Sequence, residues 1–178
     1  IWVSTFTADT YSCIKNRGIH AAAKKVKQAL REDPEGTTFC LKLDIRKFYP
    51  SINHDVLKSI LRRKLKDKRL LRLVDEIIDS ADGVPIGNYL SQYFANLYLT
   101  YFDHWIKEQK RVKHYFRYAD DIVIVASDKS YLHSLMGEIR AYLGDLKLEV
   151  KGNWQVFPVA ARGIDFVGYV FFHTHTRM

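Results

Sequence analysis

The sequence lacks the features that mark membrane-spanning, secreted and disulfide-bonded proteins. No apolar run approaches the ~18 residues that cross a bilayer, and residues 1–4 have no basic stretch leading into an apolar one. The only two cysteines, Cys13 and Cys40, show neither metal-ligand spacing nor a disulfide framework. These absences predict a cytoplasmic protein that works without a membrane partner.

Internal repeats, low-complexity tracts and Pro/Gly/Ser-rich linkers are also missing. A chain of 178 residues is long enough for one domain with its own hydrophobic core. Its net charge is +8, and the basic residues gather at 62–69 and 107–113. A basic excess favours polyanionic partners such as nucleic acid, although a run of charges on a helix is as often only a solvated face.

Apolar periodicity divides the chain into interleaved helices and strands. Spacing of three and four residues predicts helices over 17–31, 53–65, 70–78, 88–109 and 130–143. Alternation and β-branched content predict strands over 37–45, 112–116, 122–125, 146–150, 156–159 and 164–172. This order indicates the α+β class, an antiparallel sheet with helices packed mainly on one face.

Three carboxylates stand where strands end or turn. Asp44 ends an apolar strand, and Asp120 and Asp121 form the turn of an apolar hairpin. Each alone is more often an ordinary cap or turn residue, but adjacent carboxylates repel each other unless a cation offsets the charge. Mg²⁺ prefers oxygen ligands, and two such ions roughly 3.5–4 Å apart serve in-line phosphoryl displacement. Together the three residues predict a metal-dependent site.

Four segments occur in an order and spacing typical of one polymerase family. They are residues 41–52 (LKLDIRKFYPSI), 83–92 (GVPIGNYLSQ), 116–124 (FRYADDIVI) and 163–169 (GIDFVGY). In this order they resemble motif A, motif B, the Tyr-x-Asp-Asp (YADD) box and motif E, the primer grip, of reverse transcriptases. The resemblance covers about residues 10–175 and implies the fingers-palm core of a right-hand polymerase, an RNA-directed DNA polymerase (nucleotidyltransferase).

The resemblance also implies a division of the chain. It places partial fingers at 1–36, motif A of the palm at 37–52, fingers helices at 53–82, and the remaining palm with motifs B, D and E at 83–178. We expect the thumb to be absent. Because a thumb holds the template-primer duplex, the isolated chain is expected to grip its substrates poorly, and it could be inactive with an intact metal site.

The resemblance implies, position by position, which residues would bind the metal ions and which would bind the triphosphate of the nucleotide. Asp44 and Asp120 would ligate two Mg²⁺ ions, for which Mn²⁺ can substitute, together with the carbonyl of Ile45. Asp121 would be the second carboxylate of the box. A turn of exposed amides is a natural anion site, and the triphosphate of a dNTP would meet the amides of Arg46, Lys47 and Phe48.

Further positions would contact the nucleotide, the RNA template and a DNA or RNA primer. Tyr49 falls at the steric-gate position, with a core aromatic as the alternative reading. The nucleotide pocket would include Pro85, Ile86, Gly87 and Gln92. Contacts with nucleic acid are expected from Lys15 and Arg17, which match motif 2 loosely, and from Tyr118, Phe166, Gly168 and Tyr169.

Two departures from the family pattern bear on subfamily and mechanism. Ile86 replaces the Gln of most reverse transcriptases, and Ile has no hydrogen-bonding group. Residues 86–92 and 151–159 resemble reverse transcriptases of bacterial and phage diversity-generating retroelements. That resemblance implies copying with errors at template adenines and a small basic accessory protein. The motif D lysine aligns near Trp154, which leaves Lys147 or Lys151 as substitutes or ordinary surface residues.

Two other functions stay open at this stage. One is a defence-associated or retron-like reverse transcriptase with the same chemistry, which neighbouring genes would distinguish. The other is an RNA-binding module with a degenerate active site. The presence of all three carboxylates argues against the second alternative.

Overall fold

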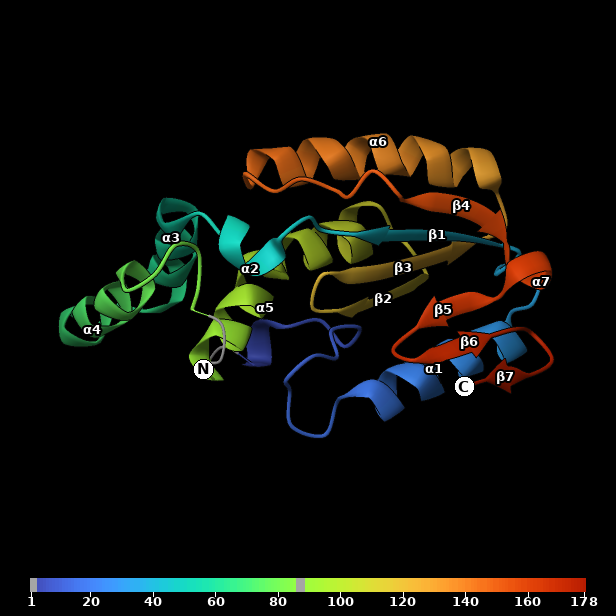
Figure 1. Cartoon of the computed structure of the whole chain (residues 1–178), viewed down its shortest axis with the longest axis horizontal. Helices are drawn as coiled ribbons and strands as arrows, with labels where there is room; N and C mark the ends of the chain where they lie inside the picture. The colour runs from blue at the N-terminus through green and yellow to red at the C-terminus, as the bar shows by residue number, and fades with distance from the viewer. Residues whose placement is uncertain (1–2, 86–88) are drawn as a thin grey trace.

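The described part of the chain forms seven α-helices and seven strands, with a 3₁₀ turn at Val3–Thr5 (Figure 1). The structure, a computed structural model, describes residues 3–85 and 89–178. The helices are α1 (Ile19–Glu32), α2 (Phe48–Ser51), α3 (His54–Lys64), α4 (Lys68–Asp79), α5 (Tyr89–His104), α6 (Lys129–Asp145) and α7 (Val159–Arg162). No helix of these residues is long and apolar enough to cross a membrane.

A four-stranded antiparallel sheet with the order β2-β3-β1-β4 forms the centre of the molecule. Its strands are β1 (Phe39–Asp44), β2 (His114–Tyr118), β3 (Asp121–Ala126) and β4 (Gln155–Pro158). A smaller antiparallel sheet joins β5 (Ile164–Phe166), β6 (Tyr169–Phe171) and β7 (Thr176–Arg177). The predicted α+β class with an antiparallel sheet is confirmed.

Alternation along β1 divides its side chains between two cores. Leu41 and Leu43 face the larger core, which α5 and α6 complete, whereas Cys40 faces a second core with α1 and the small sheet. In an antiparallel pair, successive side chains point to opposite faces, so Lys42 and Asp44 share the face of Cys40. The charged end of β1 therefore lies on the side of α1 and the small sheet (Figure 1).

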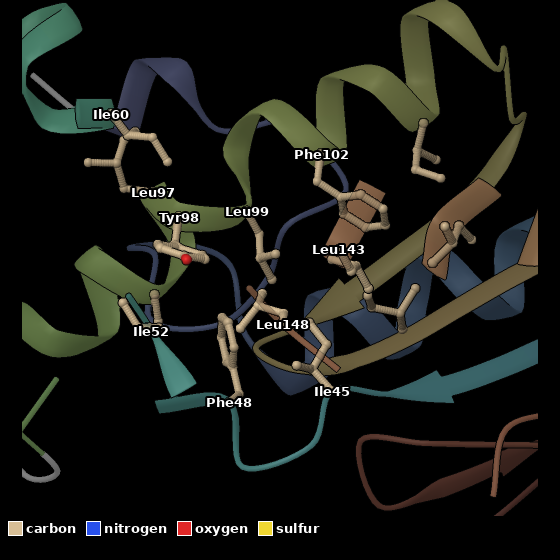
Figure 2. Close-up of a cluster of buried hydrophobic side chains, with 14 of the residues drawn as sticks. Ile45, Phe48, Ile52, Ile60, Leu97, Tyr98, Leu99, Phe102, Leu143 and Leu148 are labelled. Atoms are coloured by element: carbon tan, nitrogen blue, oxygen red, sulfur yellow. The ribbon is translucent and has the colours of Figure 1, made fainter. Parts of the chain in front are cut away.

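The larger core joins the segment after β1 to α3, α5 and α6. Figure 2 shows Ile45, Phe48 and Ile52 beside α5 residues such as Leu99, with Leu143 and Leu148 closing the cluster. All of these side chains are buried. Burial of a side chain of this size contributes about 1.5–3 kcal/mol. This packing fixes the segment that carries Asp44 against the long helix α5.

Most predicted elements are present, with shifted ends. Asn53 caps α3, since its side chain accepts a hydrogen bond from the amide of Val56 at 3.1 Å. The predicted helix over 88–109 is α5 followed by a π-helical turn, Trp105–Gln109. The short helices α2 and α7 were not predicted, because four residues leave almost no periodic signal.

Two strand predictions were wrong. Residues 146–150 form no strand and contribute only an isolated bridge between Val150 and Ile45. Residues 164–172 are two short strands rather than one, because Val167 and Gly168 both have positive φ and make a tight turn. A two-residue hairpin turn of type I′ requires positive φ at both central positions, and Val at such a position gives no sequence signal for a turn.

A buried ion pair connects three separate parts of the chain. The guanidinium of Arg117 on β2 donates to both carboxylate oxygens of Asp103 on α5, at 2.7 and 2.6 Å, and both side chains are fully buried. Asp103 also accepts from the hydroxyls of Thr10 and Tyr115. Arg117 further donates to Asn96 Oδ1 and to the carbonyl of Ala119 in the hairpin turn. Each polar side chain of this cluster therefore has a hydrogen-bond partner.

Removal of one member of this pair is expected to destabilise the fold strongly. Arg117→Leu leaves the Asp103 carboxylate buried without its cation, which costs about 3–5 kcal/mol of unfolding free energy. Urea denaturation followed by circular dichroism measures the change. The matched control is Arg46→Leu, which removes an exposed partner of Glu149 and should cost under about 1 kcal/mol. Equal losses in the two variants would contradict the importance of the buried pair.

Candidate active site

The three predicted carboxylates meet at one end of the central sheet. Asp44, the last residue of β1, is the register partner of Asp121, the first residue of β3. Directly opposed residues of antiparallel strands lie about 4.5–5.5 Å apart at Cα with side chains on the same face. Asp120 precedes Asp121 in the turn, and its carbonyl accepts from the amide of Ile45 at 3.3 Å. Strand pairing thus joins Asp44 to a residue 77 positions later in the chain.

Two lysines place positive charge beside these carboxylates. Lys42 Nζ lies 2.7 Å from one Asp121 oxygen and 2.8 Å from the other. Lys42 also donates to the carbonyl of Asp165 at 2.5 Å and lies 5.5 Å from the centre of the Phe166 ring. Lys151 Nζ lies 3.6 Å from Asp44. Lys42 therefore ties the carboxylate cluster to the β5–β6 hairpin.

The protonation of the box carboxylates reflects both burial and mutual repulsion. The pKa of Asp121 is raised to about 6, chiefly by burial; the charges of Asp44 and Asp120 act in the same direction, and Lys42 opposes the shift. Burial also raises the pKa of Asp120, with the Asp44 charge acting in the same direction. The three groups therefore lie within electrostatic reach, and a cation would relieve their repulsion.

The donor set fits Mg²⁺, although it forms no closed metal cage. Within residues 3–85 and 89–178, no three His, Cys, Asp or Glu side chains form a ready ligand group for one ion. Mg²⁺ is usually bound through one or two carboxylates, with waters and substrate phosphates as its other ligands. The facing carboxylates of Asp44 and Asp121, the neighbouring Asp120 and the carbonyl of Ile45 satisfy that requirement. The chemistry of the site is thus compatible with the predicted metal.

The segment after Asp44 forms a turn with both free and occupied amides. Lys47 has φ of 44° and precedes α2. The amide of Arg46 donates to the carbonyl of Glu149 at 2.7 Å, and its guanidinium pairs with the Glu149 carboxylate. Among the described residues, no acceptor engages the amides of Lys47 and Phe48. The predicted amide cradle is therefore narrower than expected, because the Arg46 amide already has a partner.

Motif A and motif B contact each other through backbone. The carbonyl of Tyr49 accepts from the amide of Val84 at 3.1 Å. A Cβ added to Gly83 would lie 2.2 Å from that carbonyl, and Gly83 has φ of 67°, so only glycine suits this position. Ser91 donates to the carbonyl of Pro85 at 2.6 Å and holds the loop to α5.

The remaining nucleotide-pocket residues are distributed around this contact. Gln92 is exposed on α5, whereas Ile86 and Gly87 lie outside the described residues. Tyr49 is half-buried, and its pKa is raised mainly by burial, with the Asp120 charge among the smaller causes. Tyr49 therefore lies within electrostatic reach of the carboxylate cluster.

The residues predicted to contact nucleic acid fall into different environments. Lys15 and Gly168 are exposed, and Tyr118 and Tyr169 are partly exposed. Arg17 donates to the carbonyls of Thr7 and Thr10 and so stabilises its own loop. Phe166 is fully buried, which leaves it no exposed side chain for such a contact. The exposed part of motif E is thus the turn and not the strand before it.

Sequence reasoning missed Lys42 and the Arg117–Asp103 pair. Lys42 lies two residues before Asp44 on the same strand, so alternation alone could have placed it on the same face. The pairing of Arg117 with Asp103 had no comparable signal, because α5 and β2 meet only in three dimensions. A cavity of about 370 Å³ borders the carboxylates on this side, lined by Lys42, Asp44, Asn153, Gln155, Phe157, Arg162, Gly163, Asp165 and Val170.

Comparisons with known proteins agree with this geometry. A family model described as reverse transcriptase (RNA-dependent DNA polymerase) matches residues 2–171. Protein YkfC of Escherichia coli (strain K12) is 24% identical over 222 residues, which cover 99% of this chain and 58% of that protein. An uncharacterized 91 kDa protein in the cob intron of Schizosaccharomyces pombe is 26% identical over 159 residues, covering 83% of this chain and 19% of that protein. The chain spans less than two thirds of either relative.

Solved telomerase structures share the fold. Apo telomerase from Candida tropicalis, truncated from its C-terminal domain, has a TM-score of 0.70 at 12% identity and covers 95% of this chain and 40% of its own. Telomerase from Candida albicans in complex with a TWJ fragment of telomeric RNA has a TM-score of 0.67 at 16% identity. The match covers 91% of this chain and 34% of the telomerase chain. Because the family model spans nearly the whole chain, this chain belongs to the reverse transcriptase family, whose members are RNA-dependent DNA polymerases.

Proposed function

We propose that this chain is the catalytic core of a reverse transcriptase that extends a DNA or RNA primer on an RNA template. The observation that carries the proposal is the pairing of Asp44 with Asp121 across β1 and β3. It gathers three carboxylates at one edge of a sheet beside a turn with free amides. In-line nucleotidyl transfer needs these two features together: oxygen ligands for divalent cations and donors for a triphosphate.

Each carboxylate has a distinct proposed role. Asp44 and Asp120, with the carbonyl of Ile45, would hold two Mg²⁺ ions, or Mn²⁺ in their place. The bound ions would lower the pKa of the primer 3′-hydroxyl and stabilise the departing pyrophosphate. Asp121 is held by Lys42 at 2.7 Å, so it would orient the box and lend negative charge, and it would be a weaker ligand than Asp120.

The nucleotide would lie between motif A and motif B. The amides of Lys47 and Phe48 would donate to its triphosphate, and the Tyr49 ring would exclude a ribose 2′-hydroxyl. The Gly83–Val84 backbone supports the position of Tyr49, since the amide of Val84 donates to the carbonyl of Tyr49. On the other side, the exposed motif E turn at Gly168 would meet the primer across the cavity that Lys42 and Asp44 line.

The finer proposal is a role in a diversity-generating retroelement, with a small basic accessory protein as partner. It rests on the residue pattern of 86–92 and 151–159, in which Ile86 and Trp154 replace polar family residues. A retron-like or defence-associated enzyme would use the same carboxylates. An RNA-binding module without catalysis is the less favoured reading, because all three carboxylates are present and interact.

Substitution of the first box carboxylate is expected to abolish synthesis. Asp120→Asn keeps the shape of the side chain and removes its charge, so DNA synthesis should fall at least about a hundredfold. Primer extension on RNA with Mg²⁺ measures the loss, and Asp145→Asn, an exposed aspartate at the end of α6, is the matched control. Retained activity in Asp120→Asn would refute the metal roles. Sequencing of the wild-type product tests the finer proposal, which requires errors concentrated at template adenines.

The raised pKa of Asp121 makes a prediction about the metal-free fold. A carboxyl with a folded pKa of about 6 and an unfolded value near 4 destabilises the fold above pH 6, and this penalty disappears as the pH falls below 4. The stability of Asp121→Asn relative to wild type should therefore rise between pH 4 and pH 7, by about 1–3 kcal/mol. Urea denaturation in EDTA measures it. Parallel pH curves for the two proteins would contradict the shift.

Removal of the Tyr49 ring is expected to relax sugar selection. Tyr49→Ala opens space beside the ribose, so the preference for dNTPs over rNTPs should fall by about tenfold or more, equivalent to about 1.4 kcal/mol. Tyr49→Phe keeps the ring and should retain the preference. Single-nucleotide extension with matched dNTP and rNTP pairs gives the ratio. An unchanged ratio in the alanine variant would show that Tyr49 is only a packing residue.

A further inference from the structure

The positive charge of the chain is concentrated in one helical hairpin. Residues 62–72 contain seven Lys and Arg and one Asp, a net +6 within a chain of net +8. They comprise the end of α3, the connecting turn and the start of α4. Figure 1 shows α3 and α4 projecting beyond α2, at the opposite end of the molecule from α7 and the small sheet. The electrostatic field of the protein therefore has a positive source in this hairpin, whose residues do not line the cavity beside Asp44.

The hairpin is ordered and presents these cations on a fixed surface. Leu65 in the turn is buried, and Leu61, Val74 and Ile78 pack beneath the two helices. The side chain of Asp67 accepts hydrogen bonds from the first amides of α4. An ordered basic surface binds a polyanion with less loss of conformational entropy than a flexible basic tail.

Among the described residues, only Arg62 of the seven cations has an acidic partner, and the side chains of four of the others make no ion pair, hydrogen bond or ring contact. Arg62 pairs with Asp75 at 2.6 Å, and the Arg63 guanidinium lies over the Tyr101 ring. Lys66 donates to the backbone of α3. Within the described parts of the chain, no carboxylate forms an ion pair with the other four, all of which are exposed: Lys64, Lys68, Arg69 and Arg72.

The second basic cluster of the sequence differs in this respect. Lys107 pairs with Asp9, Lys110 with Glu138 and Lys113 with Asp33. That cluster is largely neutralised by the chain itself and serves the fold. Of these two clusters, the α3–α4 cluster alone keeps a surplus of positive charge after the ion pairs among the described residues are counted.

The position of Lys68 and Arg69 is unfavourable for the helix that carries them. Both lie in the first turn of α4, where the helix macrodipole favours acidic residues and disfavours basic ones. By contrast, the basic residues at the end of α3 complement its dipole. Helix stability therefore does not explain Lys68 and Arg69, which indicates that a ligand outside the chain uses their charge.

We infer that the α3–α4 hairpin binds the phosphate backbone of RNA at a place separate from the reaction site. Arg69 and Arg72 lie one helical turn apart and offer planar donors that suit phosphate oxygens. On α4 only Leu70 and Leu73 are large exposed apolar residues, too few for the apolar centre of a protein interface. This goes beyond the proposed function, because the contact needs neither metal nor nucleotide.

RNA binding by two charge-matched variants tests the inference. One variant replaces Lys64, Lys68, Arg69 and Arg72 by Gln. The other replaces four exposed cations of α1 by Gln: Lys24, Lys25, Lys27 and Arg31. Fluorescence anisotropy with a labelled single-stranded RNA, in EDTA and without nucleotide, measures affinity across a salt series. The absence of metal makes the result independent of catalysis, so Asp120→Asn should bind as wild type does.

The hairpin variant should bind about tenfold more weakly at 0.1 M salt. The slope of its log affinity against log salt should be smaller in magnitude by about 2–3, since each lost contact with a single-strand phosphate reduces the slope by about 0.7. The α1 variant should stay within about twofold of wild type. Equal losses in both variants, or preferential capture of polyglutamate over RNA by the hairpin, would overturn the inference. Thermal melting confirms folding, and the hairpin variant should melt close to wild type, because loss of Lys64 from the end of α3 and removal of cations from the start of α4 act in opposite directions.

Discussion

The function proposed for this chain depends on one interaction, the antiparallel pairing of β1 with β3. That pairing brings Asp44 opposite Asp121 and places the carbonyl of Asp120 on the amide of Ile45. A shift of the register by one residue would turn the Asp44 side chain to the other face of the sheet. The buried alternation of Leu41 and Leu43 opposes such a shift, because it would remove both leucines from the larger core and turn the charged Lys42 and Asp44 into it. The hydrophobic core thus determines where the charged residues meet.

The buried Arg117–Asp103 pair extends this constraint to the turn itself. Arg117 donates to the carbonyl of Ala119, a residue with φ of 55°, directly before Asp120. Its backbone also pairs with Asp9 and Tyr11 of the N-terminal segment. The turn that carries the box carboxylates is therefore held from beneath by α5 and from one side by the N-terminal segment. A fully paired charge of this kind specifies one arrangement, since every alternative leaves a buried charge alone.

The sequence predicted the parts of this site that depend on local pattern. Strand alternation, helix periodicity and the Asn53 cap were readable from residue order, and so was the acidic turn at Asp120. Pairings across the fold were not readable. Nothing in the sequence joins Arg117 to Asp103 or Lys42 to the carbonyl of Asp165, because those contacts depend on how the helices and the small sheet pack. The same reason hid the burial of Phe166 and the engagement of the Arg46 amide by Glu149.

Some local conflicts with stability lie at the places to which function is assigned. Of the seven described non-glycine residues with positive φ, three lie in the turns of motif A, the box and motif E: Lys47, Ala119 and Val167. Such conformations cost of order 1–3 kcal/mol each and persist where surrounding contacts enforce them. The facing carboxylates of Asp44 and Asp121 and the basic first turn of α4 add unfavourable electrostatic interactions. The core that supports these turns is mainly apolar, so these conflicts lie at surfaces for which binding of metal, nucleotide, primer or RNA is proposed.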